Sequence, residues 1–182
     1  MSGCPPEIPA TVFGSEMEGD FFQRHGLSIY SETDRLLPQV YEVMDIVKQH
    51  DAWLATGHLS VKESMALCRL GRSRGVNMIL THPEWYRTRV PIELQLELDS
   101  LGVLIEDVWF NIADGSVSPK IMAEHIRTLG IGRVYMATDR GQVNADSPTE
   151  SMRKYIFTML EHGLTEEEID SAVRKVPKQI VT

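Results

Sequence analysis

Residues 76–84 read V-N-M-I-L-T-H-P-E, a short apolar run that ends at a threonine, a histidine and a proline. A run of this kind, bounded by turn-forming residues, is typical of a strand buried on both faces of a parallel sheet. Similar runs recur along the chain, separated by longer segments with helical spacing. The predicted strands are Ile8–Phe13, Ala52–Thr56, Met78–Thr81, Leu104–Asp107 and Val134–Ala137.

The segments between these runs carry helix-start signals. Ser60 and Glu63 have the spacing of a capping box, and Ser118 and Ser147 each precede a proline that opens a helical pattern. Further helices are predicted to begin near Pro38, after Pro91 and at Thr165. Strands that alternate with helices predict an α/β fold of right-handed βα units. The pattern fits either an open doubly wound sheet or part of a (β/α) barrel.

We expect one domain over residues 1–182, because the chain has a mass of 20.6 kDa and its apolar and charged fractions of 42% and 24% are ordinary for a globular protein. Prolines and glycines punctuate residues 1–35, which predicts an irregular N-terminal segment before βα units over residues 36–182.

The charge pattern and the absence of certain segments limit the partners. The net charge is −8 and lysines and arginines form no basic stripe, so we expect no nucleic-acid partner. No run of about 18 apolar residues is present and the chain does not start like a signal peptide, so we expect no membrane partner and a cytoplasmic protein. Gly130-Ile131-Gly132 precedes a predicted strand rather than a helix, which is wrong for a dinucleotide-binding loop.

Polar side chains follow four of the predicted strands. His58 follows the strand at residue 52, His82 follows the strand at residue 78, Glu106 and Asp107 lie at the end of the next, and Asp139 follows the last. Ligands gather at the carboxyl ends of parallel strands, and neutral imidazole with carboxylate suits a divalent metal. The sequence therefore predicts a metal site formed by His58, His82 and Asp139.

Three of these motifs, T-G-H at residues 56–58, T-H-P at 81–83 and A-T-D-R-G-Q at 137–142, resemble the amidohydrolase superfamily. They are most similar to an uncharacterised, amidohydrolase-like cytosolic family within it. The resemblance implies a (β/α)₈ TIM-type barrel with one or two divalent metals, for which we expect zinc. It also implies that His58, His82 and Asp139 are metal ligands and that Asp139 is catalytic, taking a proton from the attacking water.

The chain departs from that family in two ways. It has no H-x-H pair, and 182 residues with about five strands are too few for a complete barrel of about 250 residues. The expected fold is therefore a partial (β/α) barrel that lacks the first strands. The expected function is metal-dependent hydrolysis of a small-molecule amide, ester, lactone or phosphoester. The alternative is a non-catalytic barrel remnant that acts as a subunit or binding module.

The loops after the same strands supply the candidate substrate contacts, which are Glu84, Arg87, Asn111, Arg140 and Gln142. A partial barrel also leaves two unpaired sheet edges. We therefore expect either a homo-oligomer or a separate chain that supplies the missing front half.

Overall fold

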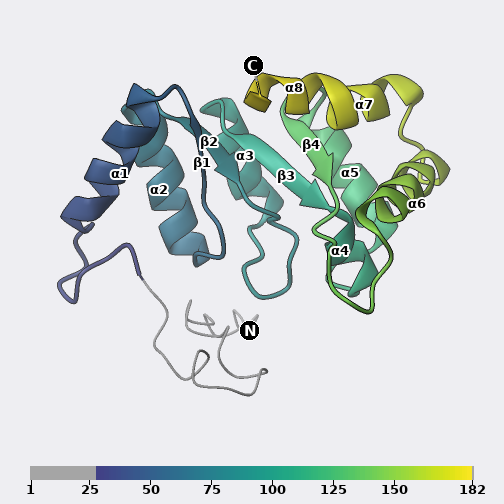
Figure 1. Cartoon of the computed structure of the whole chain (residues 1–182), viewed down its shortest axis with the longest axis horizontal. Helices are drawn as coiled ribbons and strands as arrows, with labels where there is room; N and C mark the ends of the chain where they lie inside the picture. The colour runs from purple at the N-terminus through teal and green to yellow at the C-terminus, as the bar shows by residue number, and fades with distance from the viewer. Residues whose placement is uncertain (1–27, 182) are drawn as a thin grey trace.

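A computed structural model describes residues 28–181 of the chain (Figure 1). The predicted strand Ile8–Phe13 and most of the predicted irregular segment lie outside this range. The elements in chain order are α1 (Pro38–Gln49), β1 (Trp53–Ala55), α2 (Val61–Ser73), β2 (Asn77–Leu80), α3 (Ile92–Ser100), β3 (Leu104–Val108), α4 (Trp109–Ala113), α5 (Pro119–Leu129), β4 (Val134–Ala137), α6 (Pro148–Glu161), α7 (Glu166–Asp170), the π-helix η3 (Ser171–Lys175) and α8 (Val176–Val181).

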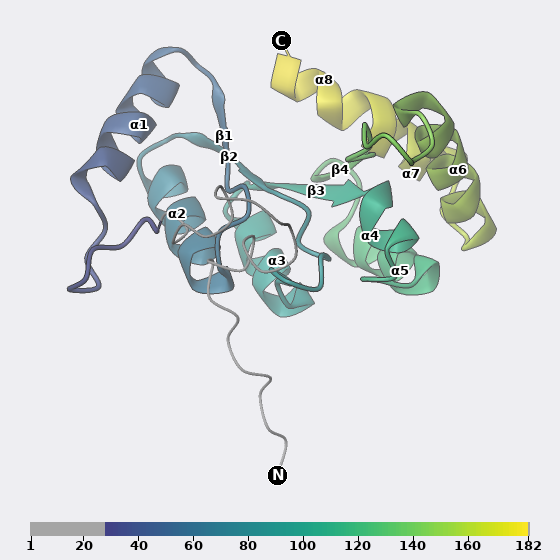
Figure 2. The ribbon, with the colours of Figure 1, turned by 60° about the horizontal axis from the view of Figure 1, so that its bottom comes forward.

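The four strands form one parallel sheet in the order β1-β2-β3-β4. Each strand lies beside the next one in the sequence, so every right-handed crossover runs in the same direction and places its helix on the same face. Figure 2 shows α2, α3 and α5 together on one side of the sheet and α8 on the other. The predicted α/β fold with parallel strands is confirmed. The order shows no reversal within the described residues, unlike a doubly wound sheet.

The two faces of the sheet are covered unequally. On the helix face, alternate strand residues such as Met78, Ile105 and Met136 join the large core beneath the connecting helices. On the opposite face, which we call the α8 face, Ile79 and Leu104 pack against Val176 of α8. Val176 thus meets the first residue of β3, Leu104, and Ile79 beside it in β2.

The local helix signals are confirmed where the structure describes them. Capping boxes at Ser60 and Thr165 open α2 and α7, and the hydroxyls of Ser118 and Ser147 cap α5 and α6. The short helix α4, which directly follows β3, has no such signal in the sequence. None of the helices in residues 28–181 is long and apolar enough to cross a membrane.

Candidate functional site at the carboxyl edge of the sheet

A threonine directly precedes the turn after three of the four strands. Gly57, His82 and Asp139 each follow such a threonine and lie two residues beyond the end of β1, β2 and β4. All three have positive φ angles, of 60°, 25° and 47°. Side chains larger than hydrogen adopt this conformation at a cost, and residues held in it cluster at ligand and active sites. The three chain turns therefore share one geometry at one edge.

The hydroxyls of Thr56 and Thr81 join the ends of β1 and β2. The Thr56 Oγ1 accepts a hydrogen bond from the Thr81 N–H at 3.0 Å. The Thr81 Oγ1 in turn accepts one from the Gly57 N–H, also at 3.0 Å. Because Thr81 and Gly57 immediately precede His82 and His58, this exchange holds the two histidine-bearing turns against each other.

The imidazole rings of His58 and His82 are in contact. Their centroids lie 4.8 Å apart, and the Trp85 ring lies 5.3 Å from that of His58 and 5.6 Å from that of His82. His82 is buried, and its Nδ1 has no hydrogen-bond partner among the described residues. Burial, reinforced by His82 and opposed by Asp139, lowers the pKa of His58. His58 is therefore neutral at pH 7, the form that binds metal.

Two carboxylates act on this pair. The charge of Asp139 raises the pKa of His58, so the Asp139 carboxylate lies within electrostatic reach of the His58 ring. Glu106 of β3 lies on the α8 face, where the nearby Tyr135 hydroxyl and His82 backbone act to lower its pKa. Burial raises the pKa of Glu106. Glu106 is a site residue that the sequence pattern does not single out, since β3 carries two adjacent carboxylates.

Three of the expected substrate contacts lie around this edge. Arg87 lies over the Trp85 and Tyr86 rings, at 5.6 and 5.2 Å from their centroids. Arg140 lies over the Phe110 ring at 5.4 Å, and the Gln142 amide donates to the Asp139 carbonyl oxygen at 3.2 Å. The edge therefore carries guanidinium groups and aromatic rings beside the histidines.

Glu84 and Asn111 are placed elsewhere. Both are buried, and the Glu84 Oε1 lies 2.7 Å from the Gln95 amide nitrogen of α3 and 2.7 Å from the His125 Nδ1 of α5. Glu84 therefore points into the helix layer rather than toward the edge. Asn111 is buried in α4, directly after β3, and its contact with a substrate stays a prediction.

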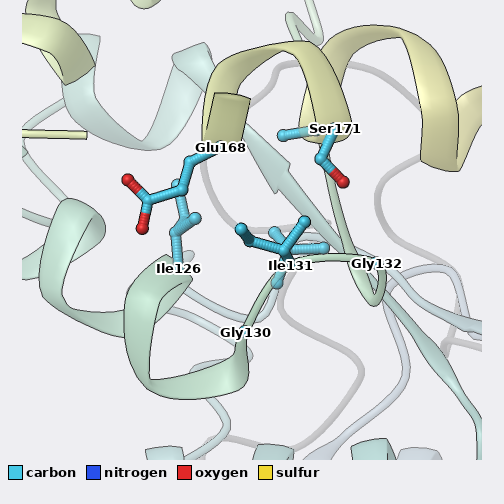
Figure 3. Close-up of a pocket in the computed structure, with 8 residues that line it drawn as sticks. Ile126, Gly130, Ile131, Gly132, Glu168 and Ser171 are labelled. Carbon is cyan, nitrogen blue, oxygen red and sulfur yellow. The ribbon is translucent and has the colours of Figure 1, made fainter. Parts of the chain in front are cut away.

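A small cavity lies near the amino end of β4, away from this edge (Figure 3). It lies between Ile126 and Gly130–Gly132 on one side and Glu168 and Ser171 on the other. Its volume of about 10 Å³ is enough for a single water molecule at most. The cavity beside Gly130–Gly132 is thus too small for a nucleotide.

A family model described as a family of unknown function, DUF6282, matches residues 9–106, which is more than half of the chain. The chain belongs to the DUF6282 family. No curated protein and no solved structure matches it.

The DUF6282 match includes β1, β2 and most of β3, and with them His58, His82 and Glu106. It ends before β4, so Asp139 and Arg140 lie outside the matched residues. The pair of imidazole rings and the hydrogen bonds of Thr56 and Thr81 therefore lie in the matched residues. Asp139, which follows β4, does not.

The site meets part of the requirement for a metal ion. The two imidazole rings are in contact, and the buried Nδ1 of His82 has no partner among the described residues, so their nitrogens suit a divalent transition metal. Within residues 28–181, however, no three His, Cys, Asp or Glu side chains are arranged so that they could hold a metal ion. In the expected set, the rings of His58 and His82 are thus in contact. The Asp139 carboxylate is near them but is not placed to complete a three-residue metal site.

Proposed function

We propose that this chain is an amidohydrolase-like, metal-dependent hydrolase that acts at the carboxyl edge of its sheet. The observation that carries the proposal is the contact of His58 and His82, which come from the ends of neighbouring parallel strands. A divalent metal such as zinc, one of the ions that imidazole suits, would supply Lewis acidity that polarises a carbonyl or phosphoryl oxygen.

The strand order supports a partial barrel as the fold. Sequential parallel strands with their connecting helices on one face are the arrangement found in a segment of a (β/α) barrel. We infer that the four described strands correspond to its later strands. The remaining metal ligand then comes either from residues of this chain outside 28–181 or from a second chain.

The described residues take distinct roles in the proposed reaction. The imidazoles of His58 and His82 bind the metal, and Asp139 accepts the proton of the attacking water. Glu106 is a positioning residue, because its carboxyl lies beside the backbone of His82 and acts on that turn. Arg87 and Arg140 contact the substrate, which is a small amide, ester, lactone or phosphoester.

The second candidate function is that of a non-catalytic binding module built on the same edge. It is favoured by the lack of a three-residue metal group among residues 28–181 and by the exposure of Asp139. Such a module would keep the two histidines and bind a ligand without turning it over.

Zinc titration of the full-length protein against a competing chelator tests the metal site. We expect about one equivalent to bind tightly, and His58→Ala and His82→Ala each to abolish tight binding. His162→Ala is the matched control, because His162 lies at the end of α6 and bonds only its own helix, at the Thr158 carbonyl. Equal binding by all three variants would show that the strand-end pair is not the site.

Hydrolysis assays with lactone, amide and phosphoester panels separate the two candidate functions. The hydrolase proposal expects turnover that zinc restores after chelation and that Asp139→Asn lowers. Zinc binding that depends on both histidines, with no turnover of any substrate class, would support the binding module instead.

A further inference from the structure

A second polar cluster lies on the other face of the sheet, beneath the helices. Asp107 of β3 points to the helix face, where the neighbouring strand positions carry apolar side chains of the core. It is about 1% exposed, and neither of its carboxylate oxygens has a hydrogen-bond partner among the described residues. An ionised or polar group in such a place is costly unless something binds it.

Asp107 is accompanied by further buried polar groups without partners. Asn111 of α4 has neither amide atom bonded, and the Tyr155 hydroxyl of α6 and the Gln95 Oε1 of α3 are also unpaired within residues 28–181. All three side chains are no more than 1% exposed. Most of the unpaired atoms are oxygens that can accept, so the cluster has an excess of acceptors and a shortage of donors or cations.

Electrostatic effects link Tyr155, Asp107 and Glu84. The charges of Asp107 and Glu84 both raise the pKa of the buried Tyr155, after the larger effect of burial, which places the phenol within reach of both carboxyls. Burial and the charges of Glu84 and Glu106 raise the pKa of Asp107. Gln95 bonds Glu84 directly, at 2.7 Å.

No Lys or Arg among the described residues offsets the charge of Asp107, since the charges that act on it, from Glu84 and Glu106, are both negative. His125 already pairs with Glu84, at 2.7 Å. The His125 side chain is 23% exposed and that of Glu84 is 2% exposed, so His125 lies between Glu84 and solvent.

We propose that this cluster binds a hard, oxygen-seeking cation of the Ca²⁺ type, held by Asp107, Glu84 and the neutral oxygens of Asn111, Gln95 and Tyr155. Ca²⁺ accepts carboxylate, amide and water oxygens in flexible geometry, whereas Mg²⁺ requires a near-octahedral set. This donor set contains two carboxylates and uncharged oxygens, so it differs in kind from the imidazole pair at the carboxyl edge. The cation joins β3, α3, α4 and α6 and therefore acts on stability.

Thermal unfolding of the full-length protein after chelator treatment tests the proposal. We expect Ca²⁺ at about 100 times its dissociation constant to raise Tm by about 5 to 10 °C, with smaller effects of Mg²⁺ and Na⁺ at equal ionic strength. Terbium, a luminescent substitute for Ca²⁺, gives a second readout. Light absorbed by Tyr155 and by Trp109, whose rings lie 5.8 Å apart, should sensitise its emission.

Asp107→Asn keeps the shape of the side chain and removes its charge, so it should abolish both the Ca²⁺ shift and the terbium emission. Asp146→Asn is the matched control, because that carboxylate is exposed and pairs with Lys154. His82→Ala should retain the full response, which separates this site from the proposed hydrolase site. Tyr155→Phe removes only the hydroxyl and should weaken both responses. It serves as the test variant if Asp107→Asn does not fold.

Two results would overturn the proposal. If the chelated wild-type protein shows no Ca²⁺ shift and no terbium emission, and Asp107→Asn is as stable as wild type, then Asp107 is a neutral acid among buried waters. If both responses persist in Asp107→Asn and Tyr155→Phe, the cation binds elsewhere.

Discussion

Replacing Thr56 or Thr81 by valine removes one hydroxyl from the exchange that joins β1 to β2, and keeps the volume and branching of the side chain. The two changes should not cost the same. Thr56→Val leaves the Thr81 N–H without its 3.0 Å acceptor in a largely buried turn. Thr81→Val frees the Gly57 N–H, which is exposed and can bond water instead.

An unsatisfied buried donor costs about 1–3 kcal/mol, and the net loss of an exposed hydrogen bond about 0.5–1.5 kcal/mol. We therefore expect Thr56→Val to lower the free energy of unfolding more than Thr81→Val. Each kcal/mol corresponds to about 2–4 °C in Tm for a domain of this size. Both variants should also weaken zinc binding, because both loosen the turns that carry His58 and His82.

Urea unfolding monitored by circular dichroism measures the difference directly. Thr128→Val is the control, since its hydroxyl bonds only the Glu124 carbonyl on the exposed side of α5 and should change stability by less than about 0.5 kcal/mol. If Thr81→Val costs as much as Thr56→Val, burial does not decide the effect. If neither costs more than the control, the exchange does not hold the strand ends together.

Three further outcomes are expected. Hydrogen bonds from Ser28, Ser60 and the Ile29 N–H outweigh burial and lower the pKa of Glu63. The free energy of unfolding should therefore fall as pH drops below about 4.5. In urea titrations at pH 3–7, Glu63→Gln should make this loss of stability at low pH smaller. Burial raises the pKa of Cys68 to about 12, so in a Cys4→Ser background native protein should resist a thiol reagent that modifies urea-unfolded protein quickly. Light scattering should report a dimer or larger species at micromolar concentration, because β1 and β4 are unpaired edges within residues 28–181; a stable 20.6 kDa monomer would contradict this.

The strands and helix starts were predictable because their signals are local. The run at Met78 and the cap at Ser60 each depend on a few neighbouring residues, and the structure places β2 and α2 within one residue of the expected positions. The approach of His58 to His82 was also predictable, since neighbouring parallel strands end at the same edge.

Side-chain direction after a strand was not predictable in this way. Glu84 follows β2 as His82 does, yet it turns into the helix layer, because Gln95 and His125 on separate helices provide its partners. Glu106 and Asp107 are adjacent acids, and only the alternation along β3 assigns one to each face. Such choices depend on contacts between segments that are far apart in the sequence.

The order of synthesis delays the burial of Ile79 and Leu104, because α8, which covers them, is made after the strands. About 40 residues separate the end of β4 from Val176, so at about 5–20 residues per second the sheet is complete some 2–8 seconds before its cover exists. During that interval an apolar patch faces solvent on the nascent chain. The heaviest demand on chaperones should therefore fall after the four strands of residues 28–181 have emerged and before Val176 follows.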